Sequence, residues 1–212
     1  LNVNAVGYEW LGHSLNPVKV NSAQARVWVG EHCAKPYQAS LFNISAMSYG
    51  SLSANAVEAM NAGAKIGGFA HNTGEGGLTP HHLKHGGDII WQIGTGYFGC
   101  RTADGNFSPE AFRKKAATPQ VKMIEIKISQ GAKPGHGGIL PASKNTPEIA
   151  AIRGIEPHTL VASPPYHKAF DTPRGLVMFV KQLRELADGK PIGFKLCIGH
   201  KSEFIGICKA MM

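Results

Sequence analysis

The sequence predicts an α/β protein whose strands form a parallel sheet and whose helices connect them. Short apolar runs of strand length alternate along the chain with longer segments of helical character. Three helical segments start with a hydroxyl residue followed by proline, at Ser108, Thr146 and Thr172. The hydroxyl can cap the helix, and proline suits its first turn. Because parallel neighbours need crossover connections, this order favours a parallel sheet, either closed into a barrel or open and doubly wound.

Each expected element has its own local pattern. The strand at 121–129 is the clearest, because isoleucines alternate with polar or charged residues along it. The segment 51–65 is rich in alanine, and apolar residues on one face predict a last helix that opens at Ser202. The expected strands are 40–47, 67–73, 89–94, 121–129 and 192–198, and the expected helices are 51–65, one from 108, 146–153, 172–189 and one from 202.

The domain organisation follows from where this alternation begins. Residues 1–40 lack sustained periodicity and indicate an N-terminal arm lying against a domain, which we expect to comprise residues 41–212. The chain stops at Met212 within an expected helix, so we expect it to be truncated. It begins at Leu1 rather than methionine, which leaves room for an N-terminal anchor or targeting segment.

Composition and charge narrow the class of function. The formal net charge is +8, but the basic residues are dispersed, with no run longer than 113–115, so we expect no nucleic-acid partner. A basic balance suits an anionic cofactor and acidic substrates. The widely spaced cysteines and the lack of a long apolar run or signal peptide predict a cytoplasmic protein without disulfides.

Two lysines are expected on the polar faces of two strands. In 121–129, Ile124 and Ile126 share one face, so Glu125 and Lys127 share the other. In 192–198 the same alternation sets Lys195 opposite the apolar residues. If helices cover the apolar face, both lysines point inward near strand ends, where a barrel has its site.

A buried ammonium group costs several kcal/mol unless an anion meets it. Lys127 alone could pair with Glu125 or with another internal carboxylate as a structural bridge. Two inward lysines beside glycine-rich loops favour a bound anionic ligand instead.

Several segments resemble, in the same order, the FMN-binding domain of the glutamate synthase family. They are I-S-A-M-S-Y-G at 44–50, N-T-G-E-G-G at 72–77, the run through Q-G-A-K-P-G at 126–135, S-P-P at 163–165 and F-K-L at 194–196. The resemblance is nearest to the stand-alone glutamate-synthase-like proteins of bacteria and archaea. It implies a (β/α)8 TIM barrel of the FMN-binding type, with about the first five β/α units present in residues 41–212.

The resemblance also implies site residues. FMN would contact Ala46, Met47, Ser48, Gln92, Lys127 and Lys195. Glu75 and Lys127 would be catalytic, and Glu75, Lys133 and Arg153 would bind the substrate, 2-oxoglutarate or the 2-iminoglutarate made from it. Two positions depart from the synthases: Ile139 stands where they have a glutamine, and His136 where they have an acidic residue.

The implied activity is an FMN-dependent oxidoreductase that makes an amino acid by reductive amination of a 2-oxo acid. An amidotransferase or an electron-donor subunit is the implied partner, and an iron–sulfur cluster would come only from residues beyond this chain. The later loops that bind the FMN phosphate would also lie beyond it, so we expect this fragment to be inactive alone. Two alternatives remain: a subunit of an enzyme forming N-methylglutamate, and a non-catalytic barrel subunit.

Other candidates have simpler interpretations. His81 and His85 have the spacing of metal ligands but lack the glutamate of a zinc motif, so we expect them and His82 to be exposed loop histidines and predict no metal site. Cys100 is expected to be a small buried thiol rather than a nucleophile.

Overall fold

The computed structural model describes residues 2, 4–7, 12, 14–17, 19, 21, 25–132 and 135–212. No helix within these residues is long and apolar enough to cross a membrane. The elements are β1 (Arg26–Val29), β2 (Tyr37–Ser40), α1 (Ala54–Gly67), β3 (Ala70–Asn72), α2 (Pro80–Leu83), β4 (Asp88–Ile93), α3 (Pro109–Ala116), β5 (Val121–Lys127), β6 (Ile139–Leu140), the 3-10 turn η2 (Ala142–Lys144), α4 (Pro147–Arg153), β7 (Val161–Ala162), α5 (Pro173–Leu186), β8 (Ile192–Lys195) and α6 (Lys201–Met211).

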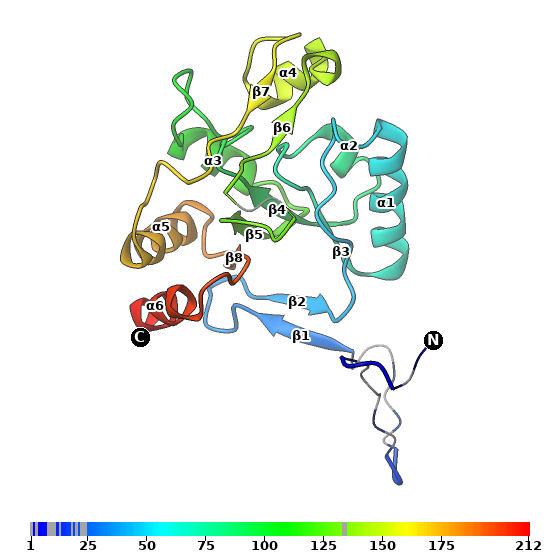
Figure 1. Ribbon diagram of the computed structural model, residues 1–212. Helices are drawn as coiled ribbons and strands as arrows, with labels where there is room; N and C mark the ends of the chain where they lie inside the picture. Colours follow the sequence, from blue (N-terminus) through cyan, green and yellow to red (C-terminus); the bar gives the residue numbers. More distant parts are fainter. Residues whose placement is uncertain are drawn as a thin grey trace.

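A parallel sheet of four strands, in the order β3-β4-β5-β8, forms the centre of the molecule (Figure 1). Ile44 adds a parallel bridge to His71 on the outer edge of β3. Neighbouring strands therefore follow chain order, as in the first part of a barrel, whereas a doubly wound sheet reverses direction at a switch point. The predicted α/β class and parallel sheet are confirmed, and the sheet formed by the described residues is open.

The core lies between the sheet and the helices on one face of it. Trp91 of β4 stacks on Phe112 of α3, and Leu183 of α5 is fully buried in the same cluster. Ile124 and Ile126 of β5 also belong to this cluster, so the predicted apolar face of the strand is confirmed. The opposite face carries Gln92 and Glu125, which hydrogen-bond to each other there.

The predicted helix starts at Ser108, Thr146 and Thr172 are confirmed. In each case the hydroxyl accepts a hydrogen bond from the backbone N–H three residues later, and proline occupies the first turn. Such a cap satisfies one of the four N–H groups that a helix start leaves unpaired. The predicted start of the last helix at Ser202 is wrong by one residue, since α6 begins at Lys201. The residue before it, His200, makes no side-chain cap.

The expected strand at 40–47 is wrong as a regular strand. Residues up to Ser40 belong to β2, which pairs antiparallel with β1, and only Ile44 bridges to the parallel sheet. The side chain of Asn43 explains the break: its Oδ1 accepts the Ala70 N–H, and its Nδ2 donates to the Ser40 carbonyl. Side-chain bonds thus replace the ladder at this point.

Part of the predicted arm is an ordered hairpin. Residues 26–40 contain β1 and β2, and Tyr37 and Ala39 of β2 pack on Ala70 of β3. The hairpin lies across the end of the sheet opposite β6, β7 and α4 (Figure 1). The boundary at residue 40 stays a prediction.

The loop after β3 differs from the expectation of exposed histidines. Thr79 caps the short helix α2, and His82 within that helix is fully buried. His81 is partly buried and contacts Glu58 and Glu148. The interpretation as exposed loop residues is therefore wrong for His81 and His82, which lie in α2, whereas His85 is exposed in a turn, as expected. The burial of His82 involves Met47, which is distant in sequence.

The expected burial of Cys100 is confirmed. It is fully buried in the main core, and burial raises the pKa of its thiol to about 12. A thiol with that pKa carries almost no thiolate near neutral pH, so it makes a poor nucleophile.

Candidate active site

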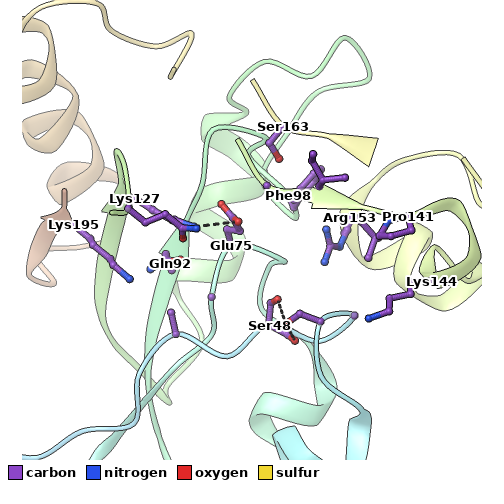
Figure 2. A pocket seen from close by; sticks show the side chains of 18 residues that line it. Ser48, Glu75, Gln92, Phe98, Lys127, Pro141, Lys144, Arg153, Ser163 and Lys195 are labelled. Carbon is purple, nitrogen blue, oxygen red and sulfur yellow. Dashed lines mark hydrogen bonds and ion pairs between the residues drawn. The ribbon is translucent and has the colours of Figure 1, made fainter. Parts of the chain in front are cut away.

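A cleft of about 280 Å³ opens at the C-terminal ends of the parallel strands (Figure 2). Ligand sites of open and closed parallel sheets lie at this end. The cleft is lined by Ala46, Ser48, Gly50, Ser51, Gly74, Glu75, Gln92, Phe98, Lys127, Gln130, Gly138, Ile139, Leu140, Pro141, Lys144, Arg153, Ser163 and Lys195.

The sheet wall of the cleft carries the two predicted lysines. Lys127 of β5 and Lys195 of β8 are direct register partners on adjacent parallel strands, so their side chains leave the same face of the sheet. Both line the cleft, and Figure 2 shows both side chains pointing into it. Two ammonium groups on neighbouring strand ends repel each other, which favours a negative charge near them.

Glu75 supplies one such charge. Its Oε1 lies 3.1 Å from the Nζ of Lys127, and the two side chains are only 22% and 12% exposed. The partner of Lys127 is therefore this internal carboxylate rather than Glu125. Glu75 comes from the loop after β3, so the pair joins that loop to the end of β5.

Two glycines make room for the Glu75 side chain. A Cβ placed on Gly94, just after β4, would lie 2.7 Å from the Cβ of Glu75. A Cβ placed on Gly138 would lie 2.5 Å from its Oε1. Any side chain at either position would displace the carboxylate, because non-bonded carbon and oxygen atoms do not approach so closely.

Glu125 belongs to a second polar group, deeper on the same face. Its Oε1 accepts hydrogen bonds from the amide groups of Gln92, at 2.5 Å, and Asn72, at 3.1 Å. The Oδ1 of Asn72 accepts the N–H of Gly74, at the start of the loop that carries Glu75. Gln92, which lines the cleft, is thereby held in one orientation.

The wall opposite the sheet is formed by α4 and the segment before it. Arg153, the last residue of α4, is only 6% exposed, and its guanidinium lies 5.0 Å from the centre of the Phe98 ring. One terminal nitrogen donates to the Tyr49 carbonyl at 3.3 Å, while Nε has no hydrogen-bond partner among the described residues. Burial lowers the pKa of Arg153, and the negative charge of Glu75 partly opposes that shift.

The third side of the cleft is the segment 46–48. Ala46 and Ser48 line it, whereas Met47 is not among the lining residues. The N–H of Met47 donates to the carbonyl of Asn72 at 3.1 Å. Gly74 packs so closely on this segment that a Cβ there would lie 2.9 Å from the Ser48 nitrogen.

The structure brings together most of the residues predicted for the site. Ala46, Ser48, Glu75, Gln92, Lys127, Arg153 and Lys195 all line one cleft. Lys133, predicted to bind substrate, lies outside the described residues. Ile139 is 62% exposed and lines the cleft, so an apolar side chain does occupy that position.

Several lining residues were missed from the sequence. Lys144, Phe98 and Ser163 come from segments without a strand or helix pattern that would place them near β5. The threonine-proline signal at Thr146 located α4 but not the side of the sheet on which it would lie. Within the described residues, no group of three or more His, Cys, Asp or Glu could hold a metal ion.

Comparison with known proteins places the chain in a family. The sequence model described as a conserved region in glutamate synthase matches residues 9–211. The chain is 46% identical over 178 residues to glutamate synthase large subunit-like protein YerD of Bacillus subtilis, covering 82% of the chain and 34% of that protein. It is 37% identical over 158 residues to the archaeal glutamate synthase (NADPH) of Archaeoglobus fulgidus, covering 74% of the chain and 28% of that protein.

The glutamate synthase (NADPH) large chain of Bacillus subtilis is 34% identical over 161 residues, which are 73% of this chain and 10% of that one. The chain thus spans about a third or less of the length of these relatives. The match extends over nearly all of the chain's own length. The chain belongs to the glutamate synthase family.

Proposed function

We propose that this chain is part of an FMN-dependent oxidoreductase of the glutamate synthase type, which forms an amino acid by reductive amination of a 2-oxo acid. The observation that carries the proposal is the charge arrangement of the cleft. Lys127 and Lys195 lie side by side on two strand ends, and Lys127 forms an ion pair with Glu75. The buried guanidinium of Arg153 lies on the opposite wall. Residues 41–212 would then form the first part of a (β/α)8 barrel, and the chain order of the parallel strands supports this.

The residues of the cleft fit an FMN ring. At 46–48 a ring can approach the backbone, because Ala46 is small and Gly74, which packs against Ser48, adds no side chain to the cleft. The donors along the sheet wall are the amide of Gln92 and the ammonium groups of Lys127 and Lys195, which suit the polar, electron-rich edge of a flavin. Bound there, FMN would supply a hydride to the substrate carbon, with its reduced anionic form stabilised by cations nearby.

The opposite wall fits a dicarboxylate such as 2-oxoglutarate or 2-iminoglutarate. Arg153 has a buried Nε with no partner among the described residues, and Lys144 lies on the same wall. A guanidinium binds a carboxylate through charge-assisted hydrogen bonds, usually two in parallel. We propose that Arg153 orients one substrate carboxylate and that Lys133 and Lys144 contribute further positive charge.

Glu75 would exchange the proton of the substrate nitrogen. Its Oε1 is held by Lys127, and Oε2, which has no hydrogen bond among the described residues, would exchange a proton with the amine or imine nitrogen of the substrate. Lys127 would thereby orient Glu75 as well as contact the cofactor. The cleft walls at Phe98 and Leu140 would help to exclude water from this exchange.

The remaining parts of the proposal concern the whole protein. We propose that an amidotransferase or an electron-donor subunit works with this barrel in the cytoplasm. Any iron–sulfur cluster would come from residues outside this chain. The names of the relatives, which include NADPH, support a pyridine nucleotide as the origin of the electrons.

The visible absorption spectrum of the purified full-length protein tests the cofactor. We expect flavin bands, release of FMN on denaturation, and their loss in Lys127→Met. Lys122→Met is the matched control, because Lys122 lies on the same strand but contacts Asp88 rather than the cleft. A colourless protein that ignores added FMN would contradict the proposal.

A substrate panel tests the reaction and separates the alternatives. With NADPH or a reduced dye supplied as the reductant, we expect glutamate from 2-oxoglutarate with glutamine or ammonium as the amino donor. The subunit of an N-methylglutamate-forming enzyme would instead use methylamine. The exposed Ile139 in the cleft cannot hydrogen-bond a substrate carboxylate and supports the other candidate, a non-catalytic subunit. Bound flavin without turnover on any amino donor would favour a non-catalytic subunit.

A further inference from the structure

His82 is a fully buried side chain that connects the helix layer to the cleft. It lies in the short helix α2 and is not among the residues that line the cleft. Its Nε2 lies 3.0 Å from the carbonyl oxygen of Met47, and its Nδ1 lies 2.8 Å from the hydroxyl of Thr79. Both ring nitrogens therefore have partners, which is what burial of a polar group requires.

These two partners define the tautomer of the ring. A carbonyl oxygen can only accept, so Nε2 carries the proton and donates it to Met47. Nδ1 is then an acceptor for the Thr79 hydroxyl, which also accepts the backbone N–H of His82. Burial lowers the pKa of His82, with a smaller opposing effect from the Met47 carbonyl, so the ring is neutral near pH 7 and keeps this pattern.

The bonded segment lies outside the regular strands, between isolated bridges at Ile44 and Tyr49. At its far end the Ser48 carbonyl accepts hydrogen bonds from the Leu52 N–H and the Ser51 hydroxyl. The peptide groups around Met47 are instead held from two directions: its N–H donates to the Asn72 carbonyl, and its own carbonyl accepts from His82. Removing His82 would leave that part-buried carbonyl without its donor.

We propose that His82 is a positioning residue that fixes the backbone of residues 46–48 as the wall against which the cofactor packs. The expected effect of His82 on cofactor binding rests on the proposed flavin function. The hydrogen bond from His82 to the Met47 carbonyl does not depend on that function. His82 itself does not line the cleft, so it acts through the backbone that it binds.

His71 provides a matched control. It is also fully buried, and its ring centre lies 5.2 Å from that of His82. Neither of its ring nitrogens has a partner among the described residues, and its side chain makes no hydrogen bond to the 46–48 segment. Replacing it with phenylalanine removes a buried imidazole while leaving the Met47 carbonyl bonded.

Hydrogen exchange tests the hold on the backbone without any flavin. In the full-length protein, His82→Leu should accelerate exchange of the Met47 amide about tenfold or more, because the segment can open without breaking the bond to His82. His82→Gln, whose side-chain amide can still donate to the carbonyl, should restore slow exchange, and His71→Phe should leave it unchanged. Equal acceleration in His71→Phe, or none in His82→Leu, would overturn the proposal.

Cofactor titration tests the consequence. The dissociation constant for FMN should rise about tenfold in His82→Leu and stay within about threefold in His82→Gln and His71→Phe. If the wild-type protein binds no FMN, the proposed function fails while the exchange result still decides the role of His82. If exchange changes as expected but FMN affinity does not, the positioning role in cofactor binding is wrong.

Discussion

The two walls of the cleft satisfy their charges in different ways. On the sheet wall, Lys127 is paired with Glu75, and Glu125 is bonded by Asn72 and Gln92. On the opposite wall, Arg153 has a backbone carbonyl and the face of Phe98, and no carboxylate lies within ion-pair distance of it among the described residues.

This difference separates groups that are already organised from groups that await a ligand. The paired groups of the sheet wall hold fixed positions before anything binds, which is what a catalytic proton donor and a cofactor contact need. The buried cation on the opposite wall lacks an anion, so an incoming carboxylate would gain the most there. The comparison therefore supports the proposed division, with chemistry at the sheet wall and substrate binding at the wall around Arg153.

The largest expected effect is on the sheet wall, from Glu75→Gln. This change keeps the shape of the side chain but removes the proton-exchanging group, so we expect kcat to fall about 1000-fold. FMN binding should persist, because Lys127 remains. Steady-state kinetics on the full-length protein measures the loss.

Glu125→Gln is the control for that prediction. It replaces another carboxylate of the same face, but one that is bonded to Asn72 and Gln92 and does not line the cleft. We expect its kcat to stay within about fivefold of wild type, since the amide oxygen can still accept hydrogen bonds. Similar losses in both variants would remove the special role of Glu75.

On the opposite wall, Arg153→Lys should affect binding more than turnover. Lysine keeps the charge but cannot form two parallel bonds to a carboxylate, so we expect KM for the 2-oxo acid to rise roughly 30-fold with kcat little changed. Arg101→Lys is the matched control: Arg101 also lies over the Phe98 ring but does not line the cleft. A fall in kcat with an unchanged KM would contradict the division between the walls.

A smaller effect is expected where the two walls meet. Gly138→Ala would bring a methyl group to 2.5 Å from Oε1 of Glu75 and displace the carboxylate from Lys127. We expect kcat to fall about tenfold, because small misplacement of a catalytic group is costly. Gly63→Ala, in α1 with no atom near the added methyl, should retain activity and raise stability by about 0.5–1 kcal/mol.

The sheet wall was largely predictable from the sequence, and the reason is local. Alternation along 121–127 and 192–195 assigns each side chain to a face, and the parallel order brings Lys127 beside Lys195. The partner of Lys127 was less predictable, because Glu75 reaches it from a loop through space left by Gly94 and Gly138.

The opposite wall depends on contacts that no periodicity reveals. The antiparallel pair β6–β7 was not predicted, and it is too short to show a pattern. The segment folds over the cleft through bonds such as that from the Thr95 hydroxyl to the Pro164 carbonyl, 69 residues away in sequence. Lys144 and Phe98 line the cleft from loop and turn segments of this kind, which carry no strand or helix periodicity.

The smallest expected effect is on stability, and it concerns the contact between Glu148 of α4 and His81 of α2. Glu148 of α4 accepts from Tyr49 at 2.6 Å and lies 3.0 Å from Nε2 of His81, whose Nδ1 contacts Glu58. The hydrogen bond to Glu58 is the main cause that raises the pKa of His81, and Glu148 adds to it. The pKa of Glu148 is lowered, by Tyr49 first and then by His81.

The sign of the pH effect follows from these shifts. Because the folded-state pKa of His81 is raised, its contribution to stability is complete below the unfolded value of 6.5 and is lost as pH rises through the folded value. Glu148 is 55% exposed, so we expect the contact to contribute only about 0.5 kcal/mol. The protection of amides in residues 147–153 from hydrogen exchange, relative to the intrinsic rate at each pH, should therefore fall slightly above neutral pH. In Glu148→Gln that pH dependence should be weaker, whereas an identical pH profile in the variant would show that the His81–Glu148 contact does not hold the wall at Arg153.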